Sequence, residues 1–163
     1  MNNKLLRQAG LFAAALAAIA VLAMPVRAAD ETRVALVIGN AHYADLTPLL
    51  SPIRDAEALA KVLRENGFSS VTVSTDATRA DLEAALADFA KEAAKADWAV
   101  VYFAGHGVEV DGRGYLIPVD ARIKTGSELG DQAVSLTRVI EATAPAGKLG
   151  LILFDAGRQN PFG

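Results

Sequence analysis

Three short apolar runs, each followed by a segment that contains glycine, are the feature that most constrains the fold of this chain. The runs are Arg33–Ile38, Trp98–Ala104 and Leu149–Phe154, and the segments after them are Gly39-Asn40, Gly105 and Asp155-Ala156-Gly157. Nearly continuous apolar runs of this length are typical of strands that are buried on both faces, as in parallel sheets. Ser70–Thr75 alternates polar and apolar residues instead, which predicts a strand nearer a sheet edge.

Helical patterns lie between these runs, at Arg54–Asn66, Thr78–Lys95 and, more weakly, Ser135–Thr143. Thr78 and Asp81 have the spacing of a capping box, which favours a helix start there. Asp111-Gly112-Arg113 predicts a hairpin turn between two short strands at 108–110 and 114–117. The alternation of strands and helices predicts right-handed βαβ units in an α/β fold, with an open, mostly parallel sheet and helices on both faces.

The first 28 residues have the pattern of an export signal. Lys4 and Arg7 precede an uncharged apolar stretch at 9–24, and Pro25 follows it. Val26 and Ala28 fit a cleavage site after Ala28. The alternative is an uncleaved membrane anchor, but the apolar stretch is shorter than the roughly 20 residues of a spanning helix. We therefore expect a signal peptide at 1–28, an exported (periplasmic or secreted) domain at 29–163, and no membrane attachment after cleavage.

Composition excludes several classes of function. The chain has no cysteine, which excludes disulfides, cysteine-ligated zinc and a thiol nucleophile. It has two histidines, His42 and His106, too few for a histidine-rich metal site. The formal net charge of −3 argues against nucleic-acid binding by a broad basic surface. Neither G-x-G-x-x-G nor G-K-[ST] nor G-x-S-x-G occurs, so we expect no metal and no cofactor.

Candidate site residues follow the predicted strands, because ligands of open parallel sheets bind beyond the carboxyl ends of the strands. His106 lies between Gly105 and Gly107, where its imidazole could reach a cleft beside open backbone N–H groups. A turn histidine between loop glycines fits the same pattern. Asp155 closes the last run, which places its carboxylate at the cleft or against loop N–H groups. Asp55 at a helix start is also explained by the helix dipole, and His42 is read as a surface-loop residue.

Taken together, these segments resemble the caspase-like cysteine peptidases of clan CD, in particular the large-subunit (p20) domain of bacterial metacaspases and orthocaspases. The resemblance covers about residues 32–163. Its most specific part is the sequence VVYFAGHGVEVDGRGYLIPVDA, which includes the catalytic-histidine motif, and it extends over RVALVIGNAHY and LILFDAGRQNPF. The fold that it implies is the three-layer caspase–hemoglobinase sandwich with a mostly parallel sheet.

The resemblance also implies roles for individual residues. Such peptidases cleave peptide bonds with a Cys–His pair, and His106 matches the histidine. Gly107 matches the residue whose N–H group would stabilise an oxyanion. Asp55 and Asp155 match the acidic residues of a pocket for the residue before the cleaved bond, which implies a preference for Arg or Lys and for basic peptide or protein partners.

The chain departs from this family at the nucleophile. Gly157 stands where the cysteine is expected, and glycine has no side chain that could attack a carbonyl. The sequence also stops at Gly163, before the family's small-subunit (p10-like) part. An exposed sheet edge is expected there, and unpaired edges favour association with another chain.

Three functions remain open from the sequence. The first is an inactive peptidase that binds basic peptides without cleaving them. The second is an active cysteine-type endopeptidase, cleaving after Arg or Lys, of which this sequence is a variant or a fragment. The third is a non-catalytic interaction module that pairs with itself or with a partner through its sheet edge.

Overall fold

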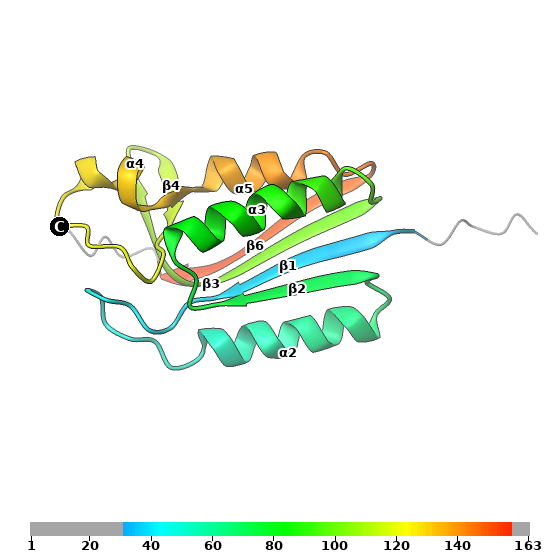
Figure 1. Cartoon of the computed structure of the whole chain (residues 1–163), viewed down its shortest axis with the longest axis horizontal. Coiled ribbons are helices and arrows are strands. Elements are labelled where there is room, and N and C mark those ends of the chain that lie inside the picture. Colours follow the sequence, from blue (N-terminus) through cyan, green and yellow to red (C-terminus); the bar gives the residue numbers. More distant parts are fainter. Residues whose placement is uncertain (1–30, 158–163) are drawn as a thin grey trace, which may run out of the picture. The chain divides into compact units, whose positions relative to one another are not determined.

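The computed structural model describes residues 31–157 and shows one α/β unit in three layers (Figure 1). The predicted signal peptide at 1–28 and the residues after Gly157 lie outside the described part. Four parallel strands form the main sheet in the order β2-β1-β3-β6. Their bounds are β1 Arg33–Gly39, β2 Ser70–Thr75, β3 Trp98–Val110 and β6 Leu149–Gly157. In the described range no helix is long and apolar enough to cross a membrane.

Helices cover both faces of this sheet, as the sequence predicts (Figure 1). Helix α2 (Pro52–Glu65) packs on one face, and α3 (Arg79–Ala93) and α5 (Leu136–Thr143) pack together on the other. The predicted capping box at the start of α3 is present: Asp81 N–H donates to Thr78, and Thr78 N–H donates to Asp81. The α/β sandwich expected from the family resemblance is therefore confirmed.

A small antiparallel extension continues from β3. Strand β4 (Arg113–Leu116) pairs with the end of β3, and the two-residue strand β5 (Val134–Ser135) pairs with β4. The predicted hairpin turn is confirmed, since Asp111 and Gly112 both have positive φ angles, of 51° and 72°. A short 3₁₀ turn, Gly126–Glu128, and a single-turn helix α4, Leu129–Gln132, complete the fold. Neither these two turns nor β5 follows from the sequence pattern.

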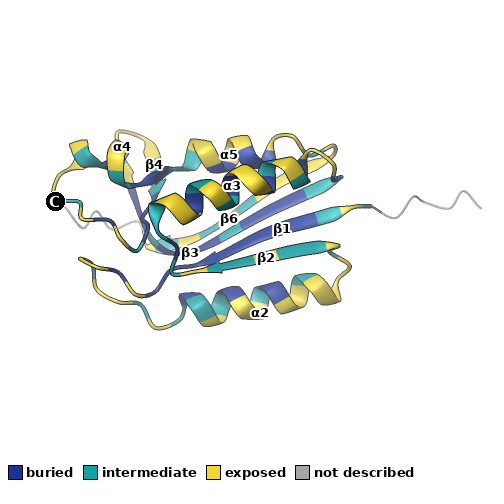
Figure 2. Ribbon diagram, viewed as in Figure 1, coloured by how far each residue is buried: buried dark blue, intermediate teal, exposed yellow. Residues whose placement is uncertain are grey.

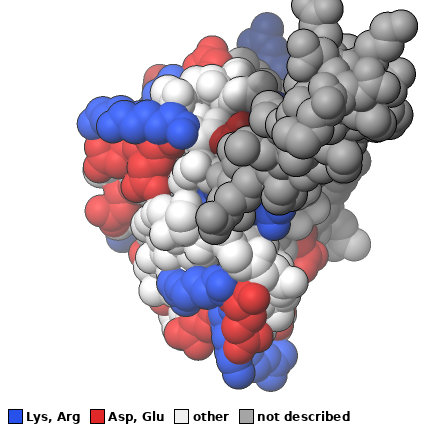
Figure 3. Space-filling view, turned by 90° about the vertical axis from the view of Figure 1, so that its right-hand side faces the viewer, with Lys and Arg blue, Asp and Glu red and all other residues white. Residues whose placement is uncertain are grey.

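The core consists of side chains from the central strands. Leu36, Ile38, Val101 and Phe103 are fully buried against α3 and α5, while Val37 packs on the α2 side (Figure 2). Trp98, the first residue of a run predicted to be buried, is only half-buried, and the Arg33 guanidinium lies 4.6 Å from its ring centroid. On the end of the molecule drawn in Figure 3, acidic and basic side chains lie beside one another.

Two predictions about β6 are wrong. The strand was expected to be buried on both faces, yet Leu149, Leu151 and Leu153 are 37–40% exposed. In the described part of the chain β6 pairs with β3 alone, and only the face toward α5 is covered by a helix. It also extends beyond Phe154 to Gly157, which makes Asp155 and Gly157 strand residues rather than loop residues.

The carboxyl ends of the strands are fixed to one another by Asn40. Its side chain is fully buried, accepts a hydrogen bond from Ala77 N–H at 2.9 Å, and donates to the carbonyls of Ala77 and Ile117. A buried amide with these partners is well satisfied. The end of β1 is therefore joined to the turn before α3 and to the segment after β4.

Candidate functional site

His106 is the centre of the candidate site, but it does not lie in a loop after the third strand. The expectation that this strand ends at Ala104 is wrong, because β3 continues to Val110. The glycine after His106 begins the pairing with β4, and Ile117 N–H donates to the His106 carbonyl. The imidazole is therefore held on regular strand backbone, where its direction is set by the pleat.

The position expected for a nucleophile lies next to His106 in the sheet. In the parallel register of β3 and β6, His106 is the partner of Gly157. Side chains at paired positions point to the same face of a sheet, and neighbouring strands lie about 4.8 Å apart. A Cβ atom built at Gly157 meets no heavy atom of residues 31–155 within 4 Å. A side chain at this position would thus stand beside the imidazole, in open space.

Two hydrogen bonds orient His106. Its Nε2 lies 2.8 Å from the Thr47 carbonyl oxygen, in the loop between β1 and α2. Because a carbonyl only accepts, Nε2 holds a proton, and in the neutral ring Nδ1 is left with the lone pair of a general base. The His106 backbone N–H donates to the Tyr43 hydroxyl at 2.8 Å. One loop therefore determines both the tautomer and the position of this histidine.

Tyr43 is a positioning residue that the sequence analysis does not identify. Its ring contacts the imidazole edge to face, with centroids 4.6 Å apart, and only 8% of the residue is exposed. Burial raises the pKa of Tyr43 well above its usual range, so the phenol stays neutral. A Cβ at Gly105 would lie 2.5 Å from the Tyr43 hydroxyl and 2.9 Å from Phe103 Cζ. Glycine at 105 is what allows this close approach.

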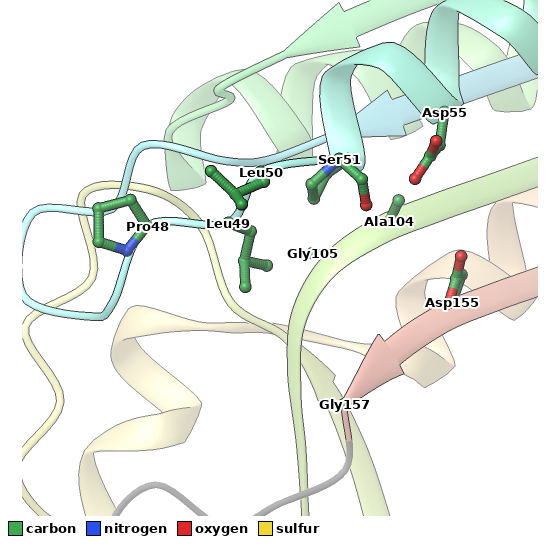
Figure 4. A pocket seen from close by; sticks show the side chains of 10 residues that line it. Pro48, Leu49, Leu50, Ser51, Asp55, Ala104, Gly105, Asp155 and Gly157 are labelled. Atoms are coloured by element: carbon green, nitrogen blue, oxygen red, sulfur yellow. The ribbon is translucent and has the colours of Figure 1, made fainter.

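A pocket of about 380 Å³ opens beside these strands, on the α2 side. Figure 4 shows Asp55, from the first turn of α2, and Asp155, from β6, with their carboxylates across the pocket from each other and Gly157 at its edge. Glycine at 39 allows α2 to begin this close to the sheet, because a Cβ there would lie 2.5 Å from the Pro52 carbonyl oxygen. The structure thus brings together the two acids that the family resemblance selected.

Tyr102 extends this acidic pair. Its hydroxyl donates to Asp155 Oδ2 at 3.3 Å. Burial, together with the negative charges of Asp155 and Asp55, raises the pKa of Tyr102 to about 12. Among residues 31–157 no Lys or Arg lies within 4.0 Å of Asp155, whereas Asp55 has a long contact of 3.8 Å to exposed Arg54. The pocket therefore has an acidic character suited to a cationic group.

His42 is not part of this pocket. Its side chain is 71% exposed, in agreement with a surface-loop histidine, and its Nδ1 lies 2.6 Å from Asp76 Oδ2. Asp76 also accepts the backbone N–H groups of Ala41 and His42. Burial alone would raise the pKa of Asp76, but these hydrogen bonds bring it below its usual value. The pair fixes the start of the loop that orients His106.

Gly107 lies next to His106 in β3, with its backbone against β6. A Cβ at this position would lie 2.7 Å from Phe154 Cζ and 2.9 Å from Ala156 Cβ. Its assignment as an oxyanion N–H donor stays a prediction. Between Glu31 and Gly157 no group of three or more His, Asp or Glu side chains could hold a metal ion. The described residues therefore place the His106 imidazole next to Gly157 in the sheet and two carboxylates in the pocket that Gly157 also lines.

Comparison with known proteins gives a family match over this whole region. A family model described as the caspase domain matches residues 32–162. The chain is 35% identical over 91 residues to the human mucosa-associated lymphoid tissue lymphoma translocation protein 1, and its mouse homologue aligns over the same length with the same identity. Each alignment covers 56% of this chain and 11% of the relative.

Proposed function

Because the chain belongs to the caspase domain family, we propose that it binds peptide segments at an Arg or Lys residue and does not cleave them. Asp55 and Asp155 receive the cationic side chain, and His106 lies beside the backbone of the bound segment. Gly157 takes the place of the nucleophile. The proposal describes a caspase-like domain that retains a recognition pocket and lacks the group that forms a covalent intermediate.

The acidic pocket is the single observation that supports the proposal most. A guanidinium group pairs with two oxygens of one carboxylate in a planar, bidentate arrangement. Asp155 has no cation beside it in the described part of the chain, and the Tyr102 hydroxyl already donates to one of its oxygens. A bound Arg or Lys would provide the missing positive charge, while Asp55 faces the same space from α2.

The absence of cleavage follows from the residue at 157. Peptide hydrolysis by a cysteine peptidase needs a thiolate that attacks the carbonyl carbon. The whole sequence contains no cysteine, so no other position can supply that thiolate. His106 could still accept a proton, but a base without its nucleophile provides little acceleration.

Calorimetric titration of the full chain with two peptides tests the proposal. One peptide contains a central Arg, and the other has citrulline, a neutral analogue of similar shape, at the same place. We expect the Arg peptide to bind at least about tenfold more tightly, since a charged hydrogen-bonded pair exceeds a neutral one by that much. Asp155→Asn should remove the difference, whereas Asp88→Asn, an exposed acid on α3, should leave it unchanged. Mass spectrometry of the recovered peptide should show no cleavage.

A second candidate is an active endopeptidase of which this sequence is a variant. It is supported by the open space at Gly157, which would accept a cysteine side chain. A third candidate is association of two copies through β6, and it is supported by the exposed Leu149, Leu151 and Leu153. Light scattering coupled to size-exclusion chromatography tests it: a dimer that Leu151→Lys dissociates supports the candidate, and a monomer at all concentrations contradicts it.

Export rests on the sequence alone. We infer that residues 1–28 direct the chain out of the cytoplasm and are then removed. Amino-terminal sequencing of the protein from its native host should begin at Ala29. A chain that retains Met1 in the cytoplasm would contradict this part of the proposal.

A further inference from the structure

We propose that the pocket recognises the carboxyl terminus of peptides that end in Arg or Lys, the products of cleavage after a basic residue. This inference rests on the proposed binding of basic residues at Asp55 and Asp155. It adds that the terminal carboxylate of the peptide binds at Gly157. In this view the glycine provides space for a terminal carboxylate beside His106.

The dimensions of the site suit such an end group. Gly157 and Asp155 are two residues apart on β6, and their Cα atoms are therefore about 6.6 Å apart. Both line the same pocket. The four-carbon stem of lysine, or the arginine side chain with its guanidinium head, spans a distance of this size. A terminal basic residue can thus place its cation at Asp155 and its own carboxylate at Gly157.

The space at Gly157 is available to two oxygen atoms. Among the described residues other than its chain neighbour, no heavy atom lies within 4 Å of a Cβ built at Gly157, and the residue is exposed at the edge of the pocket. In an uncleaved peptide the chain would continue past this point with a neutral carbonyl. A peptide that ends there has a terminal carboxylate instead. Its full negative charge then lies next to His106, the neighbour of Gly157 in the sheet.

His106 supplies the matching charge. Its Nε2–H is already held by the Thr47 carbonyl, so the second proton of an imidazolium would be on Nδ1. A carboxylate stabilises that cation through a charge-assisted hydrogen bond. The two charges of the ligand then complement those of the site. The basic side chain faces the carboxylates of Asp55 and Asp155, and the terminal carboxylate faces the His106 imidazolium. The negative charges of Asp55 and Asp155 disfavour the binding of a peptide whose terminal residue has a carboxylate and no basic side chain.

The experiment compares two labelled peptides by fluorescence anisotropy with the full chain. Their sequences are identical and end in Arg, one with a free carboxylate and one with a carboxamide. At pH 6 we expect the free acid to bind about tenfold more tightly. His106→Gln should abolish this preference, and Asp88→Asn, which changes an exposed side chain on α3, should retain it. Gly157→Val, which fills the space, should weaken the free acid more than the amide.

The outcomes separate this inference from the proposed function. Equal binding of acid and amide, with the Arg-to-citrulline difference intact, would overturn the carboxylate site and leave basic-peptide binding in place. Binding that is indifferent to both the Arg side chain and the terminal group would overturn both. A free-acid preference that persists in His106→Gln would show that another group holds the carboxylate, and would contradict the assignment to His106.

Discussion

His106 and Gly157 are direct neighbours in the parallel register of β3 and β6, although 51 positions of sequence numbering separate them. Their side-chain positions share one face of the sheet. The Thr47 carbonyl accepts a hydrogen bond from the imidazole, and the Tyr43 hydroxyl accepts one from the His106 backbone N–H. The backbone therefore places the His106 imidazole next to the position where a nucleophile is expected. Gly157 has no side chain that could act as a nucleophile.

The contact between Gly105 and Tyr43 predicts a cost for any side chain at 105. In Gly105→Ala the new Cβ would lie 2.5 Å from the Tyr43 hydroxyl, so the ring that supports His106 would have to move. We expect the variant to lose about 1–3 kcal/mol in the free energy of unfolding, as overpacked sites do. Urea denaturation measures it. The matched control is Gly130→Ala in α4, where nothing lies within 4 Å and where stability should be unchanged or slightly higher. Equal effects of the two substitutions would contradict the account.

The Asp76–His42 pair predicts a pH-dependent contribution to stability. Hydrogen bonds hold the pKa of Asp76 below its ordinary value of 3.8, so its carboxylate stabilises the native state above about pH 4. The contribution disappears as the pH falls through the lower native pKa. Asp76→Asn, which tolerates the positive φ of this residue, should cost about 1 kcal/mol at pH 7 and less at pH 3.

Urea denaturation at both pH values measures this difference. Asp88→Asn serves as the control, because Asp88 is exposed and pairs only with Lys91 on its own helix, and it should have a small effect at either pH. If Asp76→Asn were equally destabilising at pH 7 and at pH 3, the charge of Asp76 would not be the cause.

The acidic pocket predicts a change in the titration of Tyr102. Burial and the charges of Asp155 and Asp55 raise the pKa of Tyr102 to about 12. A negative neighbour disfavours the phenolate, so Asp155→Asn should move the pKa of Tyr102 down toward its ordinary value of 10. Nuclear magnetic resonance of ring-labelled tyrosine follows the titration of each ring. An unchanged Tyr102 titration would show that Asp155 does not face it in solution.

Much of the fold could be predicted from local pattern. The order of strands and helices, the edge position of β2, the cap at Thr78 and the hairpin turn at Asp111 all depend on residues near one another in sequence, and all are confirmed. The burial of β6 could not be predicted in this way. Its apolar run resembles that of a central strand, but exposure depends on which elements cover it, and that is a property of the whole fold.

The site was partly predictable for a related reason. Asp55, His106, Asp155 and Gly157 belong to sequence motifs, and the structure places the two acids and Gly157 in one pocket, with His106 paired to Gly157. The supporting groups have no such signature. The hydrogen-bond acceptor of His106 Nε2 is the backbone carbonyl of Thr47, and Tyr43 reaches the His106 N–H from 63 positions away. Tyr102 could have been found by period-two spacing, since it is four residues before His106 on β3 and so on the same face.

Placing a thiol side chain at position 157 tests the central claim most directly. Gly157→Cys would contain the chain's only cysteine, beside His106. We expect its thiol to react with iodoacetamide at pH 6.5 about tenfold faster than in the Gly157→Cys, His106→Gln double variant, because a neighbouring imidazole lowers a thiol pKa. Asp88→Asn in the same background, which changes an exposed side chain on α3, should leave the rate unchanged. Equal rates with and without His106 would contradict the claim that these two positions form the remnant of a catalytic pair.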